Sequence, residues 1–173
     1  MKPTTDMSTH SGRPAKGRST DEHAMAEAIK VLETNRVMAI STVRPDGWPQ
    51  TTIVGYANQG LTVYFMILRS SQKFANIQRD DRVSIAVGQE PAELHQAKAV
   101  FAGAHALEIK NSADRARVWK LLELRHPNLD AFDLPKRSDA AVMRADCRHV
   151  SLADYTKGLG HTEAFTVMDA PTG

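Results

Sequence analysis

The chain has 173 residues, enough for one domain, and 42% of them are hydrophobic, so a sizeable core can form. The 22 Lys and Arg residues nearly balance the 20 Asp and Glu residues, and a net charge of +2 excludes the basic excess typical of nucleic-acid-binding proteins. No apolar run approaches the roughly 20 residues that a transmembrane helix needs. We therefore expect a protein that binds neither nucleic acid nor membrane.

The ends of the chain differ in composition from its middle. Residues 1–20 are rich in Thr, Ser, Pro and Gly with scattered basic residues and no apolar segment, which predicts a disordered basic tail rather than a secretory signal. We expect residues 21–160 to form a single domain and residues 161–173 to form a C-terminal tail. Cys147 is the only cysteine, so no disulfide can form within the chain. A small buried thiol in a cytoplasmic protein is the expected reading.

The first predicted element is a helix over residues 21–35. Its apolar residues Met25, Ala28, Ile29 and Leu32 recur at steps of three and four, which places them on one face.

Three strands are predicted next, over residues 36–43, 48–57 and 61–68. Turn signals separate them, Arg44-Pro45-Asp46-Gly47 first and Asn58-Gln59-Gly60 second. Such short connections require neighbouring strands to pair, so this part of the chain is predicted to be an antiparallel meander.

The second half of the chain continues with strands and two helices. The expected elements are a short helix over residues 70–79, a strand over 82–87, a long strand or pair of strands over 98–109 with a bulge or a close backbone approach near Gly103, a helix over 111–126, a loop over 127–139 and a strand over 140–155 that is interrupted near Cys147. No crossover helix joins consecutive strands. This order favours a small, mainly antiparallel barrel with peripheral helices over a doubly wound parallel sheet.

Residues 69–73 join the third strand to the short helix and combine two cations with two hydroxyls. Free N–H groups at a helix start carry partial positive charge, and Ser70, Ser71, Arg69 and Lys73 add donors and full charges. Such a cluster suits a terminal phosphate. Ordinary capping by a serine, with a solvated lysine, accounts for the same residues equally simply.

Several short motifs follow one another with a recognisable spacing between residues 36 and 87. They are Pro45-Asp46-Gly47-Trp48-Pro49, the Thr-rich strand after it, Val63-Tyr64-Phe65, Ser71-Gln72-Lys73 with Asn76-Ile77, and Asp81-Arg82-Val83-Ser84. In this order they resemble the pyridoxamine 5'-phosphate oxidase-like family of FMN-binding split barrels. The resemblance implies a mainly β (α+β) fold, a six-stranded antiparallel split β-barrel with peripheral helices, and a homodimer with FMN at the subunit interface.

The resemblance also implies a set of cofactor-binding residues. The strand Thr51, Thr52, Ile53, Val54 would lie along the flavin ring with its backbone at the ring's polar edge, Met66 and Ile67 would line the ribityl chain and ring, and Ser71, Gln72 and Lys73 would bind the phosphate. Gln72 stands where a charged residue is common, and Thr52 stands near the position of an arginine of the true oxidases. Arg69 is our candidate for the missing charge.

His161 ends a segment, residues 154–161, that resembles a C-terminal signature of some of these flavoproteins, in which it would approach the flavin or the substrate. A histidine exposed on a mobile tail is the alternative. Trp48 is expected to pack at a barrel end and Trp119 to anchor its helix. We expect no metal site, because no His-x-x-x-His or Cys-x-x-Cys pair exists.

The function that we expect is an FMN-dependent oxidoreductase that transfers hydride or electrons to or from an unidentified small molecule. No catalytic acid or base is identified, so a flavin-binding module without turnover is one alternative. A haem or deazaflavin binder on the same fold is another. Vitamin B6 oxidation is disfavoured, since no Arg-x-His motif stands near the C-terminus.

Overall fold

A computed structural model of the chain describes residues 18–127 and 138–167, with side chains from residue 21 onward. In chain order the elements are α1 (Arg18–Thr34), β1 (Val37–Val43), β2 (Pro49–Gln59), β3 (Thr62–Leu68), α2 (Gln72–Arg79), β4 (Arg82–Gly88), η1 (Leu94–Gln96), β5 (Lys98–Glu108), α3 (Ser112–Arg125), β6 (Ala140–Asp154), η3 (Tyr155–Lys157) and β7 (Thr162–Thr166). Most of the expected loop over residues 127–139 and of the expected N-terminal tail lies outside the described residues. None of the described helices is long and apolar enough to cross a membrane.

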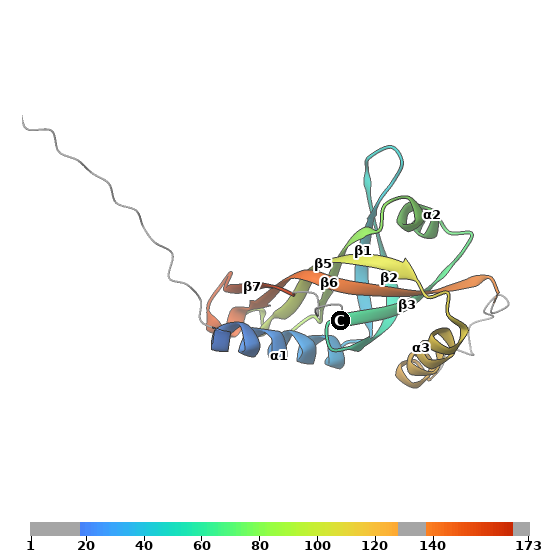
Figure 1. The fold of residues 1–173 in the computed structure, drawn as a ribbon. Helices are drawn as coiled ribbons and strands as arrows, with labels where there is room; N and C mark the ends of the chain where they lie inside the picture. The colour runs from blue at the N-terminus through green and yellow to red at the C-terminus, as the bar shows by residue number, and fades with distance from the viewer. Residues whose placement is uncertain (1–17, 128–137, 168–173) are drawn as a thin grey trace, which may run out of the picture.

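The strands form one antiparallel sheet in the order β3-β2-β1-β4-β5-β6-β7, and a further pairing of β3 with β6 closes six of them into a barrel. This confirms the predicted fold class. Both predicted turns hold a glycine with positive φ, 84° at Gly47 and 58° at Gly60, a conformation that a residue with a Cβ adopts only at a cost. The β1–β2 hairpin projects beyond the body of the barrel (Figure 1).

Helix α1 lies against the barrel, and its inward residues join the barrel core (Figure 1). Ala28 is fully buried and Leu32 nearly so, while Met25 is partly buried against the same core, as the helical periodicity predicts. Tyr56 and Phe65 are the largest side chains buried completely inside the barrel. Their burial, together with that of α1, accounts for much of the apolar surface removed from water.

The C-terminal end of α1 has no glycine cap, and side chains from other elements satisfy its carbonyls instead. The Tyr56 hydroxyl donates to Leu32 O at 2.6 Å, and the Arg125 guanidinium donates to the carbonyls of Leu32, Glu33 and Asn35. A cation at this position also interacts favourably with the helix dipole. These contacts fix α1 against β2 and α3.

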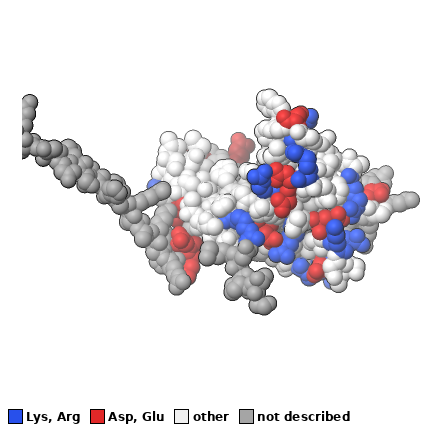
Figure 2. Space-filling view, turned by 45° about the horizontal axis from the view of Figure 1, so that its top comes forward, with Lys and Arg blue, Asp and Glu red and all other residues white. Residues whose placement is uncertain are grey.

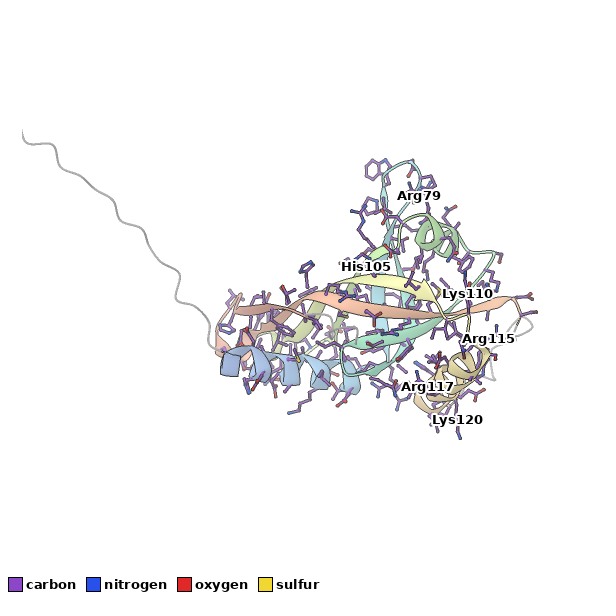
Figure 3. All side chains as sticks on the ribbon, viewed as in Figure 1. Arg79, His105, Lys110, Arg115, Arg117 and Lys120 are labelled. Carbon is purple, nitrogen blue, oxygen red and sulfur yellow. The ribbon has the colours of Figure 1, made fainter. Side chains whose placement is uncertain are left out.

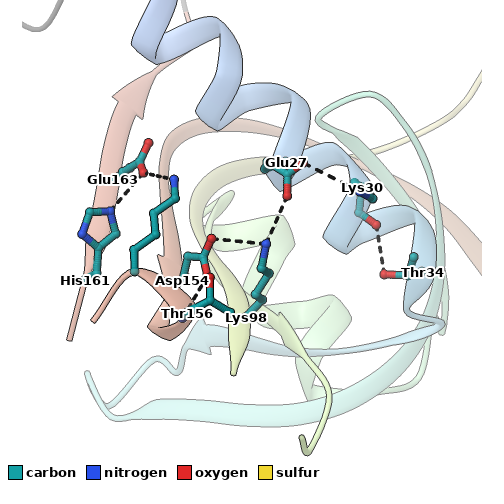
Figure 4. Close-up of polar contacts among 9 residues, drawn as sticks. Glu27, Lys30, Thr34, Lys98, Asp154, Thr156, His161 and Glu163 are labelled. Carbon is teal, nitrogen blue, oxygen red and sulfur yellow. Dashed lines mark hydrogen bonds and ion pairs between the residues drawn. The ribbon is translucent and has the colours of Figure 1, made fainter. Parts of the chain in front are cut away.

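An ion-pair network holds α1 to the other side of the barrel (Figure 4). Lys98 Nζ on β5 lies 3.2 Å from Glu27 Oε2 on α1 and 3.2 Å from Asp154 Oδ2 at the end of β6. Asp154 is buried and also accepts from Thr156 Oγ1 at 2.6 Å. The buried carboxylate is thus fully engaged, which avoids the large penalty of an unpaired buried charge.

Strand β6 changes partner along one edge at a bulge. It pairs with β3 over residues 140–146 and with β7 over residues 149–153, and its register with β5 shifts between Gly103 and Ala104, which leaves Arg148 as the extra residue. The expected interruption near Cys147 and the expected bulge near Gly103 are therefore one feature. Strand β7 lies within the segment that we expected to be a tail, and it forms because Phe165 and Glu163 alternate inward beside β6.

Candidate functional site

The barrel is split between β2 and β3, and this split is where most of the predicted cofactor residues lie. The two strands pair only from Tyr56 to Gln59 on β2, opposite residues 62–65 of β3. Beyond that point β2 has β1 as its partner and β3 has β6, among the residues that the structure describes. Residues 49–55 of β2 therefore present a free strand edge toward the start of α2.

The main-chain groups at this free edge belong to the residues with odd numbers. Arg44 N donates to Trp48 O at 2.9 Å and Tyr56 N donates to Arg36 O at 3.0 Å, which places the even-numbered residues of β2 in hydrogen-bonded pairs with β1. The N–H and C=O groups of Thr51 and Ile53 consequently point toward the split. An unpaired edge of this kind can accept hydrogen bonds from, and donate them to, a planar ligand.

The side chains of the same strand alternate between two faces. Thr51 and Ile53 lie on the outer face, where Ile53 is 68% exposed, and Thr51 Oγ1 shares a hydrogen bond of 2.7 Å with Ser41 Oγ. Thr52 and Val54 point inward, and the buried Thr52 Oγ1 has no hydrogen-bond partner in the described part of the chain. Only Thr51 and Ile53 can therefore offer side chains to a ligand on the outer face.

Met66 and Ile67 also lie on opposite faces of their strand. Ile67 is 6% exposed and belongs to the barrel core, whereas Met66 is partly buried on the outer face against α3. Neighbouring residues of a strand cannot present both side chains to one ligand. Of the two, Met66 is the one whose side chain faces outward.

At the start of α2, Ser71 is the N-cap. Its hydroxyl accepts from Phe74 N at 3.2 Å and donates to Leu68 O at 2.6 Å. Gln72, which departs from the family pattern, donates from Nε2 to Asn76 Oδ1 at 2.9 Å. The fully buried Asn76 in turn donates to Thr42 Oγ1 at 2.9 Å and to Gln50 Oε1 at 3.1 Å. Gln72 and Ser71 thus position the helix start, and Asn76, whose role we did not predict, fixes it to β1 and β2.

Two cations lie at this corner, and only one of them is paired. Arg69 forms an ion pair with Glu108, donates to Ser138 O at 3.0 Å, and lies 5.7 Å from the centroid of the Phe74 ring. Lys73 is half-buried and has neither an ion pair nor a hydrogen bond among the described residues. Because burial disfavours its charged form, the pKa of Lys73 is lowered from its ordinary value. Arg69 is therefore occupied, and Lys73 is the cation left for an anion.

His161 lies apart from these residues. It follows β6, whose other end meets β3 beside α2, and Asp154 N donates to His161 O at 3.1 Å. The 15 residues from Ala140 to Asp154 span about 45 Å in an extended strand. His161 Nε2 lies 3.0 Å from Glu163 Oε1, which also pairs with Lys157 at 2.6 Å (Figure 4). A role for His161 at the split requires a second copy of the chain.

The predictions for the two tryptophans have different outcomes. Trp119 is half-buried and packs with the cluster under α3, as expected. Trp48 is 71% exposed at the tip of the β1–β2 hairpin, so the expectation that it packs at a barrel end is wrong. Strands β1 and β2 extend past the barrel and carry the turn away from any surface on which the indole could pack.

The outer face of the sheet beside Thr51 and Ile53 is uncharged over six strands. One row across it is Ile53, Ala39, Ala86, Phe101, Ser151 and Ala164, and the adjacent row is Thr51, Ser41, Ser84, Gly103, His149 and Thr166. Phe101 is 49% exposed in this face. Figure 2 shows a broad area without charge beside a region crowded with charged residues. An exposed face that carries apolar side chains such as Ile53 and Phe101 and no Lys, Arg, Asp or Glu in these two rows can serve as an interaction surface.

Charged residues gather instead on and around α3. Figure 3 shows Lys110, Arg115, Arg117 and Lys120 on this helix and the turn before it. Arg117 has a structural task, since its Nη1 donates to Gln59 Oε1 at 2.8 Å and its guanidinium lies 5.7 Å from the Tyr64 ring centroid. None of these four residues lies beside the start of α2. At that place Lys73 is the one cation that has no ion pair among the described residues.

Cys147 offers no chemistry to the site. The thiol is 4% exposed, and burial raises its pKa to about 12. It is the small buried residue that the sequence predicts, and the neutral thiol is a poor nucleophile. Among the described residues no group of His, Cys, Asp and Glu side chains is arranged to hold a metal ion.

An antiparallel barrel of six strands, in which two neighbouring strands pair over only part of their length, has the architecture of the split-barrel proteins. A sequence profile of the pyridoxamine 5'-phosphate oxidase family matches residues 24–153, and the chain therefore belongs to this family. None of the curated proteins compared with the chain matches it.

Solved structures share the fold at low sequence identity. A heme-binding protein of Mycobacterium smegmatis superposes with a TM-score of 0.72 at 19% identity, over 83% of this chain and 57% of that one. The conserved hypothetical protein Rv2991 of Mycobacterium tuberculosis gives 0.67 at 22% identity, over 86% and 93%. A FAD-binding protein of Mesorhizobium loti gives 0.62 at 22%, over 73% and 91%. Structures of this fold thus include both a heme-binding and a flavin-binding protein.

Proposed function

We propose that the chain is an FMN-binding oxidoreductase in which the flavin lies in the split between β2 and β3, beside the start of α2. The observation that carries the proposal is Lys73, a half-buried cation without a partner among the described residues, beside a free strand edge in a member of this family. The electron donor and the small-molecule substrate are left open.

The phosphate would lie at the start of α2. The N–H groups of Gln72 and Lys73 are in the first turn, where no intrahelical acceptor exists, and the partial positive charge of the helix start adds to the charge of Lys73. A phosphate bound here would form an ion pair with Lys73. This ion pair would offset the free-energy cost of the partial burial of the lysine's charge. The Ser71 hydroxyl is already used for capping, so we assign it a positioning role and not a direct bond.

The ring would lie along the free edge of β2. The main-chain groups of Thr51 and Ile53 offer donors and acceptors to its polar edge, and the side chains of Ile53 and Met66 offer apolar surface on the outer face. When bound, FMN supplies hydride or electron transfer. The residues of the chain hold and orient it, and we assign no catalytic acid or base to them.

The site would be completed by a second copy of the chain. Thr51 and Ile53 belong to the uncharged outer face, so a partner that covers this face also covers the ring. An isologous dimer needs a self-complementary surface, and a face with exposed apolar side chains and without like charges in these rows meets that need. Sedimentation of the purified protein tests the proposed dimer: a monomer at the concentrations used for cofactor binding would refute it.

The single buried thiol supports a cytoplasmic location.

Two alternatives follow from specific observations. The similarity to a heme-binding structure of TM-score 0.72 favours a haem ligand on the same barrel. The lack of an identified acid or base favours a flavin carrier without turnover. An absorption spectrum separates haem, with its Soret band, from flavin, with its two-peaked band. Flavin that is bleached and reoxidised in the presence of a substrate would exclude the carrier.

The direct test is a titration with FMN. Lys73→Ala is expected to weaken binding by about 1.5–3 kcal/mol, the contribution of one hydrogen bond to a charged group. Lys110→Ala is the matched control, because it removes an exposed lysine near α3 and leaves the corner intact. A parent protein that stays colourless with added FMN would refute the proposal, and equal affinities of parent and Lys73→Ala would refute the phosphate assignment.

A further inference from the structure

His126 lies on the outer face of β2, next to the proposed ring site. It is the C-cap of α3, and its N–H donates to Leu122 O at 2.8 Å. Its ring covers Gly55: a Cβ at position 55 would lie 3.1 Å from His126 Cε1 and 3.2 Å from Nε2. The imidazole therefore occupies the space that a side chain of residue 55 would fill, two residues along the same face from Ile53.

A main-chain carbonyl fixes the protonation of this ring. His126 Nε2 lies 3.0 Å from Tyr56 O, and a carbonyl oxygen can only accept a hydrogen bond. Nε2 therefore carries the proton, and in the neutral ring Nδ1 is left with its lone pair. Nδ1 has no partner among the described residues, although the side chain is half-buried.

The described residues beneath His126 do not compete for that lone pair. They are Gly55 and Tyr56 of β2, which carry no charge in the neutral range. Arg125 precedes His126 at the end of α3. The Arg125 guanidinium is directed to the carbonyls at the end of α1.

We infer that His126 is a ligand-contact residue of the site, with Nδ1 as the hydrogen-bond acceptor for an N–H group on the polar edge of the bound heteroaromatic ring. Residues of one strand face that are two apart are about 6.6 Å from each other, so the ring edge that meets the main chain at Ile53 lies within reach of the imidazole. This inference rests on the proposed FMN site and adds to it a side chain, where the strand offers only backbone.

The inference predicts that the acceptor at this position matters for binding. A side chain that fills the same space over Gly55 but has no acceptor should weaken FMN binding, and one that keeps an acceptor should not.

The experiment is an FMN titration with the parent, His126→Phe and His126→Gln. His126→Phe keeps a ring over Gly55 but has no acceptor. The parent should bind FMN about tenfold more tightly than His126→Phe, as for one hydrogen bond. His126→Gln can donate to Tyr56 O and accept from the ring, so it should keep most of the affinity.

Controls and contrary outcomes are distinct from those of the proposed function. His95→Phe changes an exposed histidine in η1 and should bind like the parent. Gly55→Ala adds a Cβ 3.1 Å from His126 Cε1 that shifts the imidazole, so it should weaken FMN binding in the same direction as His126→Phe, and it carries the test if the latter does not fold. A parent that does not bind FMN refutes the proposed function. FMN binding with equal affinities of parent and His126→Phe refutes the role of His126 alone.

Discussion

Two half-buried lysines at opposite ends of the barrel have opposite electrostatic surroundings. Burial lowers the pKa of Lys98, but hydrogen bonds to Asp154 and Glu27 outweigh it and raise that pKa above the ordinary value. Burial also lowers the pKa of Lys73, and there nothing in the described chain opposes it. At one end the chain supplies its own anions, whereas at the other it leaves a cation partly desolvated. The first arrangement stabilises the fold, and the second is what an external anion would complete.

The largest effect on stability is expected at Asn76, which fixes α2, the helix that carries Lys73, to β1 and β2. Asn76→Ala removes three hydrogen bonds and leaves the side chains of Thr42, Gln50 and Gln72 without their partner, which should lower the free energy of unfolding by about 2–4 kcal/mol. Urea denaturation measures this. Gln78→Ala, on the exposed side of the same helix, should change stability by less than about 0.5 kcal/mol. Equal midpoints for the two variants would contradict the structure.

The next effect separates the two lysines directly. Lys98→Met leaves Asp154 and Glu27 without their cation, and because the lysine is partly exposed we expect a loss of about 1–2 kcal/mol. Lys30→Met is the control, since the Lys30 side chain is 71% exposed and its Nζ lies at a longer distance, 3.8 Å, from Glu27 Oε1. The free energy of unfolding should fall by less than about 0.5 kcal/mol in this variant. A Lys98 variant as stable as the parent would mean that the network does not stabilise the fold.

Low pH should destabilise the fold at the end of the barrel where the charged side chains are paired. The bonds from Lys157 and His161 lower the pKa of Glu163 from 4.5 to about 2, so its charged form is stabilised in the folded protein. A depressed carboxyl pKa stabilises the fold above its unfolded value, and this contribution is lost as the pH falls from about 4.5 to about 2. Thermal melts of the parent and Glu163→Gln should therefore converge over that window. Parallel melting curves at all pH values would disprove the assignment.

The smallest effect on stability is expected at Lys73 itself. Lys73→Met removes a half-buried charge that has no partner in the described chain while keeping the apolar stem, so the free energy of unfolding should stay the same or rise by up to about 1 kcal/mol. The same variant should lose FMN affinity. A clear destabilisation without ligand would show that Lys73 has a structural partner, and the contrast with Lys98 would fail.

Much of the barrel can be predicted from the sequence, because its early strands are joined by short turns with strong local signals. The closure of the barrel cannot, since Thr62 pairs with Asp146 and no local pattern links residues so far apart. The exposure of Trp48 escaped prediction for a related reason: nothing in the turn sequence says how far two strands extend past their neighbours.

Some features of the candidate site can likewise be predicted from the sequence, and others cannot. The Ser71 cap and the Lys73 position follow from the residues around a helix start. The alternation of a strand could have shown that Met66 and Ile67 face apart. The pairing of Arg69 with Glu108, and the placement of His126 over Gly55, depend on elements that meet only in the folded chain. The glycine within a strand is the one signal that could have pointed to a close neighbour.

The bulge at Arg148 has a consequence for how this family member can vary. Cys147 and Val150 are both buried although three positions separate them, because the extra residue resets the inward-outward alternation between them. A chain shortened by Arg148 would have a regular strand here, with Cys147 and Val150 two positions apart and both still directed inward. A one-residue insertion that no bulge accommodates would instead exchange the inward-facing for the outward-facing residues along the rest of the strand.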